Sequence, residues 1–163
     1  RDVYASSIEL EANGVAFRKR PDEGRMKGLA FCLDPDGYWI EIVKRADDSP
    51  IKNKYTLAQT MMRVKDPEKS VNFYREMFGM TLLAASDMSD FSNYFLADNH
   101  VDPGSRAGQM FEPVLELTHN HGTESDPDFS YHNGNDQDKG QVRGFGHIGF
   151  CWQGRFGQSQ VGV

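Results

Sequence analysis

An internal repeat constrains the fold of this chain more than any other feature of its sequence. Residues 2–14 and 66–79 both have the pattern of a helix that begins at an aspartate and ends at a glycine. Each predicted helix is followed by a short strand and then by a pair of similar strands. The repeating unit is therefore β-α-β-β-β, and two such units are expected to form one core, because neither buries its own apolar face alone.

The two copies of the unit are not equally complete. The second copy, residues 57–119, has all five elements, whereas the first copy lacks its opening strand. In the first copy, strands are expected at Val15–Phe17, Gly28–Leu33 and Tyr38–Val43, with a tight turn at 34–37. In the second copy, strands are expected at Leu57–Val64, Met80–Ala84, Phe91–Leu96 and Val114–His119. A further strand is expected at Gly144–Phe150, with no helix after it.

Length, charge and cysteine content narrow the class of protein. The 163 residues make up one domain of ordinary size, and the formal net charge of -6 without a Lys/Arg cluster argues against nucleic-acid binding. No apolar run approaches the roughly 20 residues that a membrane-spanning helix needs. Cys32 and Cys151 form no C-x-x-C pair, which disfavours a disulfide scaffold or a thiolate zinc site. We therefore expect a cytoplasmic protein with neither nucleic-acid nor membrane partners.

Four predicted strands each place one metal-capable polar side chain in mid-strand. These side chains are Gln59, Glu116, His147 and Glu41. Leaving such a group buried without a partner costs about 1–3 kcal/mol, and more when the group is ionised. Convergence of the four on one cation would remove that cost, so the spacing predicts a metal site. The alternative for each residue alone is a solvent-facing glutamate or a hydrogen-bonded structural histidine. We interpret three other histidines as non-ligands: His119, which points to the opposite face from Glu116, and His121 and His132 in polar loops.

A second polar group lies four residues along the same face of three of these strands. The three residues are Arg63, Asn120 and Arg143. Four residues of strand span about 13 Å. The pattern predicts a cation at one place and an anion-binding patch at that distance, which suits an elongated substrate with carboxylates at one end.

Several long motifs lie at residues 26–31, 34–42, 59–67, 115–120, 131–135 and 143–149. They resemble motifs of the lactoylglutathione lyase (glyoxalase I) family, in its eukaryotic zinc-using form, within the vicinal-oxygen-chelate superfamily. Together they cover about residues 2–150. The resemblance implies an α+β fold of paired βαβββ modules that enclose the site.

The order of the modules departs from the usual order in that family. The stretch 55–150 resembles the part that ordinarily comes first, yet here it follows 2–43. The chain is either a natural circular permutant or a piece of a tandem two-unit protein, and we favour the second because tandem forms exist in the family that it resembles. The expected divisions are 1–44, a C-terminal-type module without its first strand; 45–54, a linker; 55–142, an N-terminal-type module with long loops; 143–150, the first strand of a further module; and 151–163, an atypical tail.

The resemblance also implies a ligand set, a metal and a partner. By motif, the metal ligands would be Gln59, Glu116, His147 and Glu41. The metal would be Zn²⁺, because a glutamine in the first ligand position accompanies zinc-using members; Ni²⁺ or another divalent metal is the alternative. The modules that share a site would belong to one full-length chain or to a homodimer, and the sequence leaves both open.

The implied reaction is isomerisation of the hemithioacetal of glutathione and methylglyoxal to S-lactoylglutathione through an enediolate, with glutathione as co-substrate. Glu41 is the expected base, with Glu116 able to act from the other side. The residues expected to hold the glutathione carboxylates are Arg63, Asn120, Arg143 and Lys19. Those expected to line the hydrophobic pocket are Met26, Leu29, Phe31, Met61 and Phe91. Asn93 stands where the family usually has a leucine.

Two other functions remain open. An extradiol dioxygenase would share the fold, but it uses two histidines and one carboxylate, and Gln59 argues against it. An inactive or incomplete module that binds thiol conjugates is the alternative outside catalysis.

Overall fold

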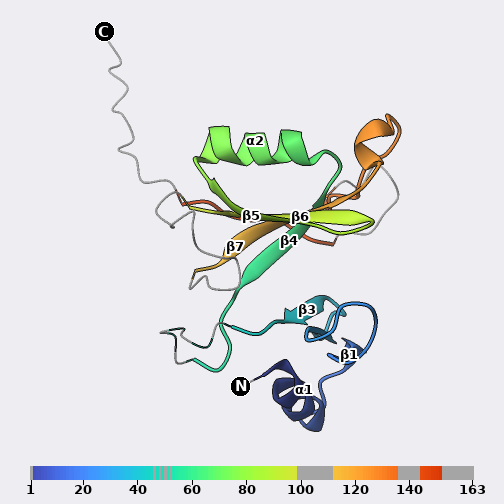
Figure 1. Cartoon of the computed structure of the whole chain (residues 1–163), viewed down its shortest axis with the longest axis vertical. Helices are drawn as coiled ribbons and strands as arrows, with labels where there is room; N and C mark the ends of the chain where they lie inside the picture. The colour runs from blue at the N-terminus through green and yellow to red at the C-terminus, as the bar shows by residue number, and fades with distance from the viewer. Residues whose placement is uncertain are drawn as a thin grey trace. The chain divides into compact units, whose positions relative to one another are not determined.

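The computed structural model describes residues 2–45, 47, 49, 51, 53–98, 112–135 and 144–151. Its contacts divide the chain into a unit of residues 1–127 and a unit of residues 128–163, and each is described by itself. Helices and two sheets make up the first unit, which confirms the predicted α+β class (Figure 1). The elements are α1 (Val3–Ala12), β1 (Phe17–Lys19), β2 (Ala30–Leu33), β3 (Trp39–Ile42), β4 (Gln59–Val64), α2 (Pro67–Phe78), β5 (Thr81–Asp87), β6 (Phe91–Ala97), β7 (Val114–Asn120) and the 3₁₀ turn η2 (Thr123–Ser125).

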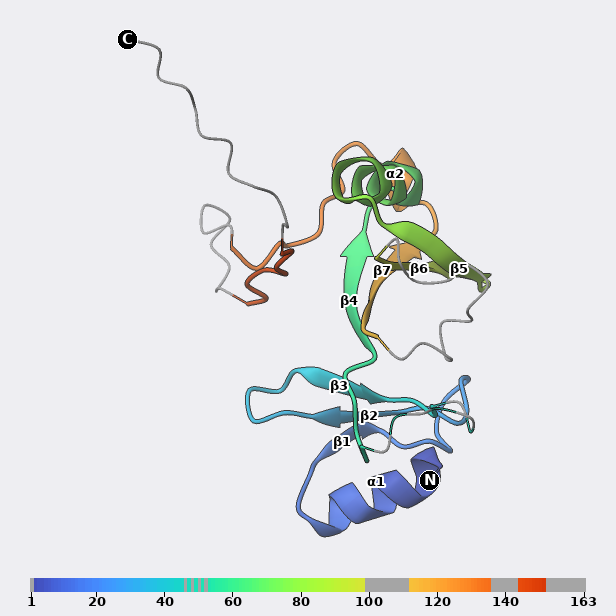
Figure 2. The same ribbon diagram turned by 90° about the vertical axis from the view of Figure 1, so that its left-hand side faces the viewer.

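The first copy of the repeat forms an antiparallel sheet of order β1-β2-β3, with α1 along one side (Figure 2). The helix begins where the sequence predicts, because the Asp2 side chain accepts a hydrogen bond from the Ala5 backbone N–H at 2.8 Å. The turn between β2 and β3 is closed by Asp34, whose carboxylate accepts from the backbone N–H groups of Asp36 and Tyr38. Gly37 has a φ of 85°, a conformation that favours glycine.

The second copy forms a four-stranded sheet of order β4-β7-β6-β5, covered on one face by α2 (Figure 1). The β4–β7 pair is parallel and the other two pairs are antiparallel. Asp66 caps the start of α2 by accepting from the Lys69 backbone N–H, and Pro67 occupies the first turn. Gly79 ends the helix in the left-handed conformation, at the residue that the sequence predicts.

The largest fully buried side chains are Leu96 and Leu117, on the two central strands of the four-stranded sheet. Strand β7 is buried from Val114 through His119, because β4 lies on one side of it and β6 on the other. The equivalent strand of the first copy, β3, has a neighbour on one side only, and its Trp39 is 59% exposed. Within the described residues, no strand lies beside the edge of β3 that corresponds to the β4 side of β7.

Several predicted strands differ from the structure, since β2 begins at Ala30 rather than Gly28 and β4 begins at Gln59 rather than Leu57. Strand β1 begins at Phe17 rather than Val15, because the Val15 N–H still donates to the carbonyl of Leu10 at the end of α1. Strand β5 runs from Thr81 to Asp87, longer than the predicted Met80–Ala84, because it pairs with β6 down to their connecting turn. Residues 144–150 form no strand; an extended segment becomes one only through a ladder with a neighbour, and none is described for it.

Cys32 is buried and Cys151 is exposed, and neither forms a disulfide. Neither of the two described α-helices has the length and apolar character needed to cross a membrane.

Removal of the Leu117 side chain tests the position of the core. We expect Leu117→Ala to lower the free energy of unfolding by about 2–5 kcal/mol, because the side chain is fully buried and its loss leaves a cavity. Leu57→Ala is the matched control: Leu57 is 65% exposed, and its loss should change that free energy by less than about 0.5 kcal/mol. Urea denaturation followed by circular dichroism measures both, and equal losses would contradict the placement of the core.

Candidate metal centre and its surroundings

The face of the four-stranded sheet opposite α2 carries most of the candidate site residues of the second copy. In β7 these are Val114, Glu116, Thr118 and Asn120, which alternate with the residues that point toward α2. The parallel register sets Gln59 of β4 beside Val114 and Met61 beside Glu116. The face predicted from strand alternation is therefore the face observed.

Gln59 joins this sheet to the sheet of the first copy. Its amide nitrogen donates to a carboxylate oxygen of Glu116 at 2.6 Å and to a carboxylate oxygen of Glu41 at 2.8 Å. Glu41 lies in β3, opposite Phe31 of β2. The structure thus brings together three of the four side chains whose convergence the sequence predicts. In the sequence, Glu41 is 18 residues and Glu116 is 57 residues away from Gln59.

Burial makes this carboxylate pair electrostatically unusual. The Glu116 residue is only 6% exposed, and desolvation raises its pKa to about 7, with the charge of Glu41 adding to the rise and the Gln59 hydrogen bond opposing it. Burial also raises the pKa of Glu41, while the Gln59 hydrogen bond and the positive charge of Lys19 lower it. Two carboxylates this close repel each other when both are ionised, and a cation would relieve that repulsion.

The chemistry of the cluster fits a divalent cation. Its potential ligands are two carboxylates and the oxygen of one amide, and hard oxygen ligands of this kind suit ions such as Zn²⁺ or Mg²⁺. Within the described part of the chain, no three His, Cys, Asp or Glu side chains are grouped to hold a metal ion. The cluster by itself therefore offers three potential ligands, two carboxylates and one amide oxygen.

His147, the fourth predicted ligand, belongs to the unit of residues 128–163, where it is exposed. Its segment is held within that unit by two hydrogen bonds: the Gly144 N–H donates to the carbonyl of Gly134, and the Asn135 amide donates to the carbonyl of Gly146. Arg143 lies outside the described residues.

Of the residues predicted to form an anion-binding patch, Arg63 and Asn120 lie side by side. The Arg63 guanidinium donates to the Asn120 amide oxygen at 2.8 Å at the exposed end of β4 and β7. Lys19 does not join them: it belongs to β1, and its ammonium group donates to the carbonyl of Leu29 at 2.7 Å. The patch in the described residues is therefore smaller than the sequence predicts.

The predicted pocket-lining residues divide between the two sheets. Phe31 lies beside Glu41, Met61 beside Glu116, and Phe91 beside Asn120. Met26 and Leu29 lie in the connection from β1 to β2.

Two aromatic residues on the site faces were missed in the sequence. Trp39 packs on Phe31 with ring centroids 5.4 Å apart, and Phe95 lies opposite Glu116. Strand alternation is the signal that could have found both residues. It puts Trp39 on the same face of β3 as Glu41, and it puts Phe95 of β6 on the same sheet face as Glu116.

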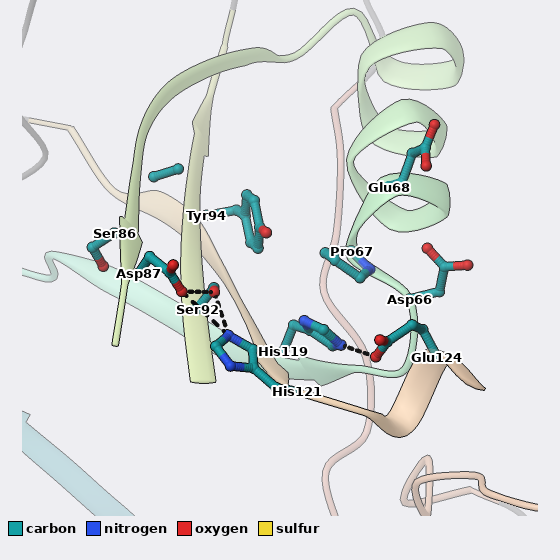
Figure 3. A pocket seen from close by; sticks show the side chains of 11 residues that line it. Asp66, Pro67, Glu68, Ser86, Asp87, Ser92, Tyr94, His119, His121 and Glu124 are labelled. Atoms are coloured by element: carbon teal, nitrogen blue, oxygen red, sulfur yellow. Dashed lines mark hydrogen bonds and ion pairs between the residues drawn. The ribbon is translucent and has the colours of Figure 1, made fainter. Parts of the chain in front are cut away.

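The other face of the four-stranded sheet carries a separate pocket near the start of α2 (Figure 3). Here His119 bonds to Glu124 at 2.7 Å, and His121 bonds to the Ser92 hydroxyl at 2.7 Å. Because adjacent residues of β7 point to opposite faces, His119 lies across the sheet from Glu116, as the sequence predicts. The pocket is therefore distinct from the Gln59 cluster.

Comparisons with known proteins agree with this arrangement. Residues 1–42 and 56–153 match the model of the glyoxalase/bleomycin resistance protein/dioxygenase superfamily. The chain is 43% identical over 155 residues to glyoxalase I of Saccharomyces cerevisiae, covering 90% of this chain and 45% of that protein. It is 45% identical over 151 residues to lactoylglutathione lyase of Schizosaccharomyces pombe, covering 90% of this chain and 47% of that protein. It thus spans about half the length of these relatives.

A solved structure shows the same fold. Glyoxalase I from Zea mays superposes with a TM-score of 0.58 at 33% sequence identity, over 74% of this chain and 40% of that chain.

The raised pKa of Glu116 gives the metal-stripped protein a defined dependence of stability on pH. Since the pKa rises from its usual 4.5 to about 7 on folding, the folded state holds this proton more tightly than the unfolded state. The contribution of Glu116 to the free energy of unfolding is therefore fully present below pH 4.5 and is lost as the pH rises through 7.

Urea denaturation between pH 4.5 and 8 in the presence of a chelator measures this effect. Glu116→Gln keeps the size of the side chain but does not titrate. The free energy of unfolding of the wild type minus that of the variant should therefore fall as the pH rises from 4.5 through 7. A difference independent of pH would contradict the environment described for Glu116.

Proposed function

Because the chain belongs to the glyoxalase/bleomycin resistance protein/dioxygenase superfamily, we propose that it acts as a lactoylglutathione lyase, which converts the hemithioacetal of glutathione and methylglyoxal to S-lactoylglutathione. The observation that carries this proposal is the Gln59 amide held between two carboxylates from different sheets, the buried Glu116 and the half-buried Glu41. The relatives named glyoxalase I and lactoylglutathione lyase support the same choice. A cytoplasmic location is part of the proposal, in keeping with the two free cysteines.

The metal in this proposal is Zn²⁺, with Ni²⁺ as the alternative. Gln59, through its amide oxygen, and Glu41 and Glu116, through their carboxylates, would hold it together with the His147 imidazole. When bound, the cation would acidify the C–H bond next to a carbonyl and stabilise the negative charge that develops there.

The remaining steps are assigned to this chain's own residues. Isomerisation requires that one carboxylate accept the proton from the sulfur-bearing carbon and return it to the neighbouring carbon, so that no atom is gained or lost. Glu41 is assigned as this base, and Glu116 would act from the opposite side. Lys19, whose charge lowers the pKa of Glu41, would favour the ionised form that accepts the proton.

In this proposal, residues at both ends of one sheet face bind the substrate. The Arg63–Asn120 pair lies four residues along β7 from Glu116, about 13 Å away, and would hold a carboxylate of glutathione. Arg143 would supply further positive charge, and Met26, Leu29, Phe31, Met61 and Phe91 would surround the apolar part of the substrate. The positive charge is therefore local in a protein whose net charge is -6.

One observation favours a second candidate function, a module that binds thiol conjugates without converting them. The described cluster contains two carboxylates and one amide but no imidazole. An extradiol dioxygenase fits less well, because that chemistry needs two histidines with one carboxylate, whereas this cluster has two carboxylates and an amide.

Glu41→Gln tests the proposed catalytic role. We expect the variant to lose at least about 100-fold in kcat for thioester formation, followed at 240 nm, because the general base is gone, while metal content stays unchanged. Glu124→Gln, on the other face of the sheet, is the control and should keep wild-type activity. Full activity in Glu41→Gln would contradict the assignment, and a fully metallated wild type without activity would favour the binding module.

The organisation of the modules is a further part of the proposal. In the second copy, β4 lies parallel to β7 and carries Gln59 at its start. The equivalent edge of β3 has no such neighbour in the described sheet. We propose that the segment 144–150 of a second copy of the chain, or of another module in a longer chain, supplies this strand and brings His147 to the Gln59 cluster.

Mixing two inactive variants separates these alternatives. Glu41→Gln and His147→Ala each remove one component, but a mixed dimer with exchanged strands would contain one intact site. We expect mixing to restore about a quarter of wild-type activity, since random pairing makes half of the dimers mixed, each with one of its two sites intact. No recovery after unfolding and refolding the mixture would contradict exchange between copies.

A further inference from the structure

Asn93 of β6 lies on the same sheet face as the carboxylate cluster. The antiparallel register places it opposite Thr118 of β7, and the parallel register places Thr118 beside Arg63 of β4. Thr118 stands midway along β7 between Glu116 and Asn120. A ligand that extends from the cluster to the Arg63–Asn120 pair would therefore pass Asn93, about 7 Å from the Glu116 position.

The carboxamide of Asn93 is oriented by one hydrogen bond. The hydroxyl of Thr118 donates to the Asn93 amide oxygen at 3.0 Å, and Thr118 is only 6% exposed. The amide nitrogen of Asn93 has no hydrogen-bond partner among the described residues. With its oxygen directed to the Thr118 hydroxyl, the side chain keeps both N–H donors for a ligand on this face.

The surroundings of Asn93 on β6 are apolar. Phe91 and Phe95 are its neighbours on the same face, two residues away on either side, and both are partly buried. Donors placed among aromatic rings favour a ligand that supplies an acceptor, because covering an N–H with an apolar group leaves it unpaired. Across the strands, by contrast, Asn93 lies opposite two polar residues, Ser86 of β5 and Thr118 of β7, so the aromatic contacts come only from along β6.

We propose that Asn93, oriented by Thr118, determines specificity for glutathione conjugates whose S-linked group carries a hydrogen-bond acceptor such as a carbonyl or ether oxygen. The inference rests on the proposed function, since it takes a glutathione conjugate as the ligand. Asn93 would contact the ligand, whereas Thr118 is a positioning residue.

Binding of two matched conjugates tests this proposal without any turnover. S-(2-oxopropyl)glutathione and S-(2-methylpropyl)glutathione differ mainly by a carbonyl oxygen in place of a methyl group. Titration calorimetry on the zinc-loaded chain gives the ratio of their dissociation constants. We expect the wild type to prefer the oxopropyl conjugate, and Asn93→Leu and Asn93→Asp each to reduce that preference about tenfold, the value of one hydrogen bond.

The two substitutions check each other. Asn93→Asp keeps the size of the side chain and replaces donors by an acceptor, so it loses the ketone preference even if the bulkier Asn93→Leu fails to fold. Ser92→Ala is the matched control, because Ser92 lies one residue away on the opposite face and bonds to His121. Its ratio should equal that of the wild type.

Thr118 has its own readout. Thr118→Val should reduce the preference for the oxopropyl conjugate, as the Asn93 substitutions do. Thr118→Ser keeps the hydroxyl and should have the wild-type preference. Binding of both conjugates with an unchanged ratio in Asn93→Leu and Asn93→Asp would overturn this inference alone. Binding of neither conjugate by the wild type would overturn the proposed function and this inference with it.

Discussion

The candidate site of this structure depends on the two hydrogen bonds that the Gln59 side chain donates. Its amide nitrogen bonds to Glu41 of one sheet and Glu116 of the other, so a single group links the two copies of the repeat at their functional faces. Amide hydrogen bonds offset part of the cost of burying two carboxylates, but the raised pKa of each shows that the cost is not removed. Carboxylates with perturbed pKa values of this kind are typical of functional sites.

The repeat explains why the two halves differ in burial. Strand β7 has neighbours on both edges and is buried along its length, whereas β3 has one neighbour and exposes Trp39 and Ile40. Glu116 and Glu41 occupy equivalent positions in these strands, and the more buried of the two has the pKa that is raised to about 7. The different burial of two similar strands therefore gives two equivalent carboxylates different pKa values.

Much of this arrangement could be predicted from the sequence, because it depends on local signals. The aspartate caps and terminal glycines set the limits of α1 and α2, and the alternation of strand side chains placed Glu116 and His119 on opposite faces. The hydrogen bond between Asn93 and Thr118 could not be predicted, because it depends on the register of β6 against β7. Residues 144–150 read as a strand from their composition, but a strand also needs a partner, which local sequence does not specify.

Metal binding by the purified chain tests the central claim most directly. Equilibrium dialysis of the metal-stripped protein against Zn²⁺, followed by elemental analysis, gives the number of ions retained per chain. The account predicts one tightly held ion per chain in the wild type and none in the Glu41→Gln/Glu116→Gln double variant, with the fold of both confirmed by circular dichroism. Equal retention of Zn²⁺ by the two folded proteins would contradict the assignment of these carboxylates as metal ligands.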